Sequence, residues 1–443
     1  MNLGADMAEM TMPQEAEHTA TAPRPQPAGH LPLRRNLSFQ TLWAGSAAST
    51  LGLSVADIAY PLTILALTGS PAEAGLFAAG QTAGMILAGL PAGHLADRKS
   101  PRALLIGAEA GRALITAAVV AALVMGWLTF PMLLVAAVLL GAGQPVVSAT
   151  RILLVRAVVP AEQLTSALAQ DEIRINGAEL AGPPLGGALY GLRVLAHAVP
   201  FLLTAASFVL SLVSALLVRA GGAGDPAGRS ADQAAAQPAG NGAASRPGML
   251  AGITAIWGNT LFRSATMLLA LLNTVGAGLN LIAVVILRSQ SVSPAMIGVA
   301  LAGAAVGGLA GAPLIRPLHR LRPGVLLIAV AVLEIPLIAL LALPFGPWWM
   351  AGLLFAAMLA VPSLRVLLDV LILRQAPADQ RGRIISAVMT LMTIGMPAGI
   401  AASGLLLQYL PARTAVLILA GVLAAGVLYA ATRRQLWRAR WPE

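Results

Sequence analysis

The chain has 443 residues, of which 58% are hydrophobic and only 10% are charged. Average proteins carry about a quarter charged residues, so this composition excludes an ordinary soluble protein and indicates a polytopic membrane protein. The formal net charge of +10 would suggest nucleic acid in a soluble domain, but most of the arginines fall in alternate short loops, which favours membrane orientation and no nucleic-acid partner. The lack of cysteine excludes disulfides, thiol catalysis and Cys-ligated metals.

The chain begins with a polar stretch and continues with six apolar runs. Residues 1–36 lack an apolar core, so we expect a disordered cytoplasmic tail rather than a signal peptide. Residues 37–219 contain apolar runs of about the 20 residues that cross a bilayer as a helix. These runs lie near residues 42–67, 73–95, 103–126, 132–152, 167–190 and 198–218. They predict an N-terminal half of six helices.

A second set of runs follows a polar linker. Residues 220–247 are rich in Gly, Ala, Pro and Ser, which predicts a flexible cytoplasmic linker. Residues 248–432 predict a C-terminal half that begins with a short interfacial helix around Trp257, and residues 433–443 predict a basic cytoplasmic tail. The six runs of this half lie near residues 265–287, 295–316, 324–344, 348–370, 384–408 and 413–432. The expected fold class is an all-α membrane protein with twelve transmembrane helices.

Arginine is concentrated in the loops on one side of the predicted membrane. The loops after the second, fourth, eighth and tenth runs carry Arg98, Lys99, Arg102, Arg156, Arg320, Arg322, Arg374, Arg381 and Arg383. The opposite loops hold only Arg193, Arg288 and Arg413. Because short basic loops stay in the cytoplasm, we expect both termini there. The preference for arginine over lysine fits a high-GC bacterium, so we expect a multi-pass protein of the bacterial inner (plasma) membrane.

The second half repeats the first. The segment from Ser70 reads SPAEAGLFAAG, and the segment from Ser293, 223 positions later, reads SPAMIGVALAG. The loop Pro160–Gln163 likewise matches Pro377–Gln380 at an offset of 217. These matches predict two pseudo-symmetric six-helix halves in parallel repeat.

A charged hinge follows the second run and reads GHLADRKSPR from Gly93 to Arg102. It resembles the loop between helices 2 and 3 of the major facilitator superfamily of transporters, apart from Ser100 and Pro101. The resemblance implies a gating motif in which Asp97 latches the cytoplasmic gate against the start of helix 11. This motif comprises Gly93, Asp97, Arg98 and Arg102, with Glu109 and Arg112 on the next helix. A plain basic loop is the alternative.

The fifth run contains a second motif, Gly182, Pro183, Pro184, Leu185, Gly186 and Gly187. It resembles the helix-5 motif of antiporters in the same superfamily; glycines permit close helix approach and prolines interrupt the hydrogen-bond ladder. Together with LTGSP at Leu67, the hinge and the PAEQL loop, it looks like the drug, macrolide and siderophore exporter branch. That likeness implies export driven by an ion gradient, usually of protons. The alternative is ordinary helix packing that says nothing of direction.

Acidic residues within the membrane are costly and each requires a partner or a task. Asp57 lies inside the first run, and the repeat offset places it opposite Asn280 of the seventh. We expect Asp57 to couple transport to protons, since removal from water favours a neutral carboxyl group. The alternative is a solvated or hydrogen-bonded acid at a helix bend.

Other charges form local patterns. Glu172, Asn176 and Glu179 share one helix face, which predicts either a proton relay, with Glu172 and Glu179 as carriers, or a structural network. Glu109 and Arg112 are spaced to neutralise one another, as are Asp171 and Arg174. Glu334 of the ninth run is expected to be a packed acid.

The resemblance implies a central cavity lined by helices 1, 4, 7 and 10. Its candidate cargo-binding residues are Asn273, Asn280, Gln144, Ser148 and Arg365. Arg365 is spaced to pair with Asp369 and would otherwise bind an anionic group. The remaining Gly-rich, apolar wall suits a bulky, mostly hydrophobic cargo.

These observations lead to one functional hypothesis. We expect a monomeric secondary transporter that exports a small, largely hydrophobic drug, antibiotic or siderophore-like molecule by proton antiport and alternating access, with efflux and antibiotic resistance as its biological setting. We expect no cofactor and no metal, and no enzyme activity, because the catalytic and phosphate-binding motifs of membrane enzymes and pumps are missing. The alternatives are a proton-coupled importer of a small metabolite and a non-transporting membrane receptor.

Overall fold

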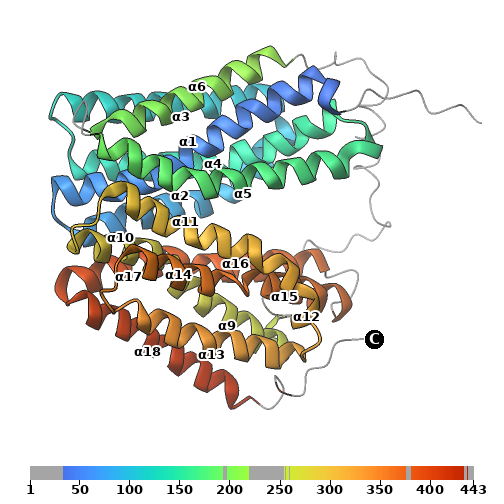
Figure 1. Ribbon diagram of the computed structural model, residues 1–443. Helices are drawn as coiled ribbons and strands as arrows, with labels where there is room; N and C mark the ends of the chain where they lie inside the picture. Colours follow the sequence, from blue (N-terminus) through green and yellow to red (C-terminus); the bar gives the residue numbers. More distant parts are fainter. Residues whose placement is uncertain are drawn as a thin grey trace, which may run out of the picture.

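The computed structural model describes residues 33–192, 197–218, 254, 256–258, 260–375, 381–433 and 437 (Figure 1). Within these ranges the chain forms helices joined by short loops and has no strand. Most of the predicted tail 1–36, the whole predicted linker 220–247 and most of the predicted tail 433–443 lie outside them. The last residues of the first tail are helical: Leu33–Arg35 form the 3-10 turn η1, in which Leu33 is buried.

Six long helices form the N-terminal half. They are α1 (Leu37–Leu67), α2 (Pro71–Arg98), α3 (Pro101–Val124), α4 (Phe130–Val158), α5 (Leu164–Gly191), which follows the 3-10 turn η2 (Ala161–Gln163), and α6 (Val199–Leu217). Their bounds agree with the predicted runs to within a few residues. The helices continue past the apolar residues at the end that carries the arginine-rich loops, as α4 does to Val158.

The C-terminal half contains more, shorter helices. They are α9 (Thr260–Ala277), α10 (Leu279–Ser289), α11 (Pro294–Gly311), η4 (Ala312–Leu314), α12 (Ile315–Leu318), α13 (Pro323–Leu340), α14 (Pro347–Met358), α15 (Val361–Gln375), α16 (Arg381–Ile394), α17 (Met396–Tyr409) and α18 (Ala412–Ala431). Trp257 is helical and exposed, but its neighbours at 255 and 259 lie outside the described residues, so the predicted interfacial helix is seen only in part.

Proline and glycine account for the shorter helices. A proline inside a helix removes one backbone donor and clashes with the carbonyl of the preceding turn. Pro397 accordingly follows the interruption between α16 and α17 at Gly395, and Pro362 follows the one between α14 and α15. Gly278 separates α9 from α10. Three predicted runs are therefore pairs of helices, and a fourth consists of α11, η4 and α12.

The helices are long and apolar enough to cross a membrane. Ten spans meet a criterion of length and hydropathy, with α9–α10, α11–α12, α14–α15 and α16–α17 each counted as one span. The α2 and α5 helices are 28 residues each, long enough to span a bilayer but more polar. With these two, the bundle has the twelve membrane-crossing units that the sequence predicts.

The sequence repeat is visible in the helix starts. Ser70 caps α2 by accepting a hydrogen bond from the Glu73 N–H, with Oγ and N 3.2 Å apart, and Pro71 opens the helix. Ser293 caps α11 in the same way through the Met296 N–H, at 3.4 Å, and Pro294 follows it. A serine cap before a proline is a strong helix start, since proline needs no backbone partner there. The matching motifs therefore build matching elements.

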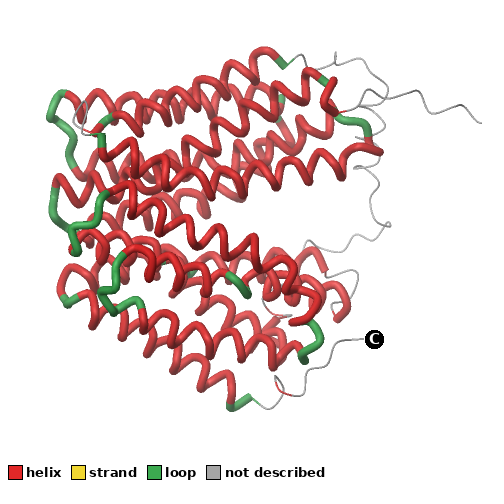
Figure 2. Tube along the Cα trace, viewed as in Figure 1, coloured by secondary structure: helices red, strands yellow, loops and turns green. Residues whose placement is uncertain are grey.

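The two halves meet at the end opposite the arginine-rich loops. There α2 packs on α17 and α5 packs on α11, both through glycines. Ser70 Oγ donates to Gln408 Oε1 at 2.9 Å, and Arg288 Nη1 donates to the Leu62 carbonyl at 2.9 Å. Figures 1 and 2 show the two halves, coloured blue to green and yellow to red in Figure 1, diverging toward the arginine-rich end. The space between the halves is therefore closed on one side of the membrane.

Candidate functional site

A cavity of about 570 Å³ lies between the two halves. On the N-terminal side it is lined by α1, α2, α4 and α5, and on the C-terminal side mainly by α10, α11, α14 and α17. This volume falls within the roughly 300–1,000 Å³ of small-molecule sites. The sequence predicts walls from the first, fourth, seventh and tenth runs; the structure adds the second, fifth, eighth and eleventh, because the contacts that close the opposite end bring these helices to the midline.

Two carboxylates face the cavity, Asp57 of α1 and Glu179 of α5, and both side chains are exposed there. Gln81 of α2 also lines the cavity and interacts with Asp57. Asp57 interacts electrostatically with Glu179 and with the buried Arg112 of α3. The structure thus brings together two acids that are 122 positions apart in the sequence. Sequence reasoning did not assign Gln81 to the cavity. Its strongly polar side chain within the second apolar run is the feature that could have indicated this position.

Of the predicted cargo-binding residues, Gln144 of α4 and Asn280 of α10 line the cavity. Ser148 lies one turn beyond Gln144 and donates from Oγ to the Gln144 carbonyl at 3.0 Å. Asn273 precedes the helix interruption at Gly278 and donates from Nδ2 to the Leu269 carbonyl at 3.0 Å. Neither Ser148 nor Asn273 is among the cavity residues.

The predicted anion-binding residue is also outside the cavity. Arg365 lies on α15 and is exposed, whereas the cavity is lined by Met358 at the end of α14, before the interruption. The side chain of Asp369, its predicted partner, lies outside the described residues.

The polar stripe of α5 is divided between two environments. Asn176 and Glu179 line the cavity, while Glu172 is exposed and is not a lining residue. Asn176 Nδ2 donates to the Glu172 carboxylate at 3.3 Å. Glu179 is therefore the acid of this stripe that borders the cavity.

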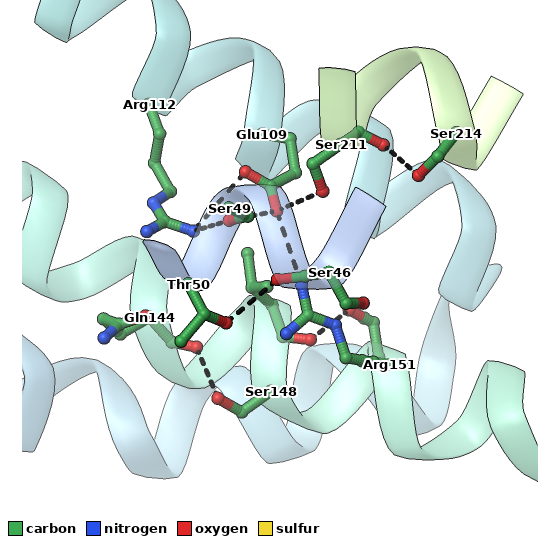
Figure 3. A network of polar contacts seen from close by, with 12 residues as sticks. Ser46, Ser49, Thr50, Glu109, Arg112, Gln144, Ser148, Arg151, Ser211 and Ser214 are labelled. Atoms are coloured by element: carbon green, nitrogen blue, oxygen red, sulfur yellow. Dashed lines mark hydrogen bonds and ion pairs between the residues drawn. The ribbon is translucent and has the colours of Figure 1, made fainter. Parts of the chain in front are cut away.

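A buried polar network lies behind the cavity wall, within the N-terminal half (Figure 3). At its centre Glu109 of α3 is 0% exposed and accepts hydrogen bonds from Ser49 of α1 at 3.0 Å and from Ser211 of α6 at 2.8 Å. Arg112 Nη1 lies 3.4 Å from one carboxylate oxygen and Arg151 Nη2 of α4 lies 3.8 Å from the other. One carboxylate thus holds four helices together.

Nearby arginines make further contacts with neighbouring helices. The Arg112 guanidinium lies 4.1 Å from the centre of the Phe208 ring, a cation–π contact. Arg174 of α5 pairs with Asp171 at 2.7 Å and donates to the Ser46 carbonyl at 2.9 Å and to the Thr50 hydroxyl. The spacing predicts the pairs Glu109–Arg112 and Asp171–Arg174, and the structure confirms both contacts. The sequence does not indicate Arg151, which comes from another helix.

The predicted gating residues lie at the arginine-rich end of α2 and α3. The side chain of Asp97 lies outside the described residues, and a Cβ on Gly93 would meet no atom within 4 Å. Arg102 donates from Nε and Nη2 to the carbonyls of Ala215 and Leu216, at 3.1 and 2.6 Å. These carbonyls end α6 and have no partner within the helix, so Arg102 caps that helix.

The GPPLGG motif packs α5 against both halves. A Cβ on Gly182 would lie 2.2 Å from Ser54 of α1, and one on Gly187 would lie 2.1 Å from the Pro294 carbonyl of α11. Both distances are too short for any side chain. The α5 helix runs unbroken through Pro183 and Pro184. The motif is therefore a contact surface, with Gly182 and Gly186 toward α1 and Gly187 toward the other half.

In the C-terminal half, Glu334 of α13 is buried at 9% exposure. In the repeat it falls near Arg112, but it does not border the cavity. Its burial agrees with the prediction of a packed acid.

Solved structures with the same architecture are numerous. A bacterial homologue of the human lysosomal transporter Spinster, inward-facing and unoccupied, matches with a TM-score of 0.69 at 17% identity, over 94% of this chain and 100% of that one. A bacterial homologue of the iron transporter ferroportin, also inward-facing, matches with a TM-score of 0.69 at 18% identity, over 93% and 100%. A D-xylose–proton symporter matches with a TM-score of 0.64 at 14% identity, over 88% and 96%. At these identities the likeness establishes the fold alone.

Sequence comparison assigns the family. A search among curated protein sequences finds no match. The sequence profile of the Major Facilitator Superfamily matches residues 42–287 and again residues 265–440, so it covers nearly all of both halves. Two repeated six-helix halves around one central cavity are the architecture of such transporters. The chain therefore belongs to the major facilitator superfamily of membrane transporters.

Proposed function

We propose that the protein is a secondary active transporter that exports a small, largely hydrophobic molecule in exchange for protons. The observation that carries the proposal is the cavity of about 570 Å³ with Asp57 and Glu179 on its wall, closed at one end by the contact between the halves. Alternating access requires one central site that opens to each side in turn. The seam of glycines between the halves supports such a movement, since it holds them together without interlocking side chains.

Asp57 is proposed as the proton-coupling residue, with Glu179 as its neighbour. A carboxylate within the membrane is costly, and protonation removes its charge. Asp57 is accessible from the cavity, whose described lining residues include no Lys, Arg or His, so a proton can be taken up or released there without breaking an ion pair in the wall. Proton release would leave a negative site for cargo, and proton uptake would release that cargo.

The direction of transport is proposed from the GPPLGG motif, which resembles that of antiporters, and the cargo is proposed to be a drug, antibiotic or siderophore-like molecule. A proton-coupled importer of a small metabolite is the second candidate, and the similarity in fold to a D-xylose–proton symporter favours it. A non-transporting receptor is a third.

We further propose a monomer in the bacterial inner membrane with both termini in the cytoplasm, from the arginine-rich loops. The cavity would then face the cytoplasm in this structure.

A transport assay tests the coupling. Cells with and without the protein are compared for accumulation of a compound panel, and the compounds exported are then followed in proteoliposomes with an imposed pH gradient. Asp57→Asn is expected to abolish gradient-driven accumulation but to retain exchange of labelled for unlabelled cargo, because exchange needs no net proton movement. Glu162→Gln, which changes an exposed acid outside the cavity, is the control. Full gradient-driven transport by Asp57→Asn would exclude the assignment, and energised uptake by right-side-out vesicles would exclude export.

A further inference from the structure

The two walls of the cavity differ in polarity. The wall formed by the N-terminal half holds both carboxylates, Asp57 and Glu179, together with three amide side chains. On the opposite wall Asn280 is the one residue with a polar side chain among the described lining residues. A molecule between the halves therefore meets negative charge on one side and apolar surface on the other.

The negative charge of the polar wall is not neutralised within the cavity. Among the described residues that line it there is no Lys, Arg or His. The electrostatic neighbours of Glu179 are themselves acids, Glu172 of α5 and Asp57. Arg112 attracts Asp57 from behind the wall but is itself paired with a buried glutamate at 3.4 Å. Away from bulk water these charges act strongly on a bound molecule.

The apolar wall offers a broad, adaptable surface. It includes Leu281 and Val284 of α10, Leu301 of α11, and Met396 and Ile400 at the start of α17. Aliphatic side chains attract apolar groups of many shapes, and methionine adapts to irregular ones. This wall is suited to the body of a ligand rather than to its polar group.

We propose that the cargo is an amphipathic cation, with a positively charged nitrogen between Asp57 and Glu179 and an apolar body against the C-terminal half. An anion of the same shape would face two like charges, so the site selects by repulsion as well as by attraction. The inference rests on the proposed transport function only in calling the bound molecule a cargo. The preference for a positive charge is a property of the cavity and can be measured without transport.

A size-matched binding panel tests this charge preference. The full chain is reconstituted in nanodiscs of zwitterionic phosphatidylcholine, and binding is followed by ligand fluorescence at pH 7.5. Each set contains an aromatic ring (naphthalene, anthracene or pyrene) that carries an aminomethyl, a hydroxymethyl or a carboxylate group. The ammonium member is expected to bind at least about tenfold more tightly than the alcohol, the advantage of one charged hydrogen bond. The carboxylate is expected to bind most weakly.

Two variants locate the preference. Asp57→Asn combined with Glu179→Gln should reduce ammonium affinity to that of the alcohol, while alcohol affinity stays unchanged and reports an intact cavity. The control Glu162→Gln should keep the full preference, since it removes a negative charge outside the cavity. Should the double variant fail to fold, the wild-type panel alone decides.

The proposal is overturned if no ammonium binds more tightly than its alcohol in any set, or if the preference persists in the double variant. Transport separates this result from the proposed function. Proton-coupled export of a neutral or anionic compound would leave the transport function standing and remove the cation preference. Tight ammonium binding without any pH-gradient-driven transport would support the cation preference and exclude the proposed transport function.

Discussion

Glu109 carries the charge balance of the buried network in the N-terminal half. It is fully buried and lies within 3.8 Å of two arginine side chains and two serine hydroxyls. Removing one partner of a buried pair leaves the other charge uncompensated, which costs about 3–5 kcal/mol. We therefore expect Glu109→Gln to lower the stability of the folded protein by an amount of that order, measured as a lower thermal unfolding midpoint in detergent.

Glu172→Gln is the matched control, because Glu172 is exposed and its hydrogen bond from Asn176 can be kept by glutamine. Its unfolding midpoint should equal that of the wild type. Arg112→Met added to Glu109→Gln should restore part of the lost stability, since the unpaired charge is then reduced. Equal midpoints for the wild type and Glu109→Gln would show that the network contributes nothing to stability.

At the residue scale, the sequence predicts a side-chain contact when both residues lie on the same helix. The pairs Glu109–Arg112 and Asp171–Arg174 follow from helical spacing alone and are present at 3.4 and 2.7 Å. Arg151 reaches Glu109 from another helix, so only the packing of α3 on α4 reveals it. The same limit applies to the cavity: spacing places Asn273 and Asn280 on one face, but the break at Gly278 separates them.

At the scale of elements, the repeat produces two equivalent seams between the halves. Gly75 of α2 and Gly298 of α11 occupy the same repeat position, as do Gly404 of α17 and Gly187 of α5. A Cβ on Gly75 would lie 2.9 Å from the Gly404 Cα, and one on Gly298 would lie 2.1 Å from the Pro183 carbonyl. Each seam thus depends on the absence of a side chain.

We expect Gly75→Val and Gly298→Val each to shift the population away from the conformation described here, and the double variant to shift it further, because the added methyl groups separate the halves at the closed end. Spin labels on Leu67→Cys and Tyr409→Cys, exposed residues of the two halves at that end, report the separation by pulsed electron resonance. The distance distribution should move to longer values. The chain contains no native cysteine, so labelling is specific.

Gly421→Val on α18 is the control for this measurement, since a Cβ there meets no atom within 4 Å. It should leave the distribution unchanged. A valine at Gly75 and Gly298 that alters nothing would mean that the seams do not determine which side is closed.

The membrane-crossing units were largely predictable, because each apolar run is bounded by loop residues and matches one helix or a sequence of consecutive helices. Less predictable was that α2 and α5 would line the cavity. Their polar residues, among them Gln81, Asn176 and Glu179, make them less apolar than the other spans. In a membrane protein that polarity is itself a signal, since such side chains avoid lipid and face a partner or a water-filled space.

At the scale of the whole molecule, the repeat predicts two similar halves but not which end is closed, because the same sequence must form both states of an alternating-access cycle. The contact surfaces decide it here. Gly75 of α2, near the closed end, is packed against Gly404 of the other half, whereas a Cβ on Gly89 or Gly93 near the arginine-rich end would meet nothing within 4 Å. The cavity therefore opens toward the arginine-rich loops.

This asymmetry predicts labelling from one side only. The positive-inside rule predicts that the arginine-rich loops are cytoplasmic. A single cysteine at Asn176, which lines the cavity, should react with a membrane-impermeant maleimide in inside-out vesicles and be protected in intact spheroplasts. Thr68→Cys, at the exposed turn after α1 on the closed side, should show the opposite pattern and serves as the control. If Asn176→Cys reacts from outside while Thr68→Cys does not, the orientation is inverted. If both react from outside, the halves spend much of their time open at the end that the glycine seams close in this structure.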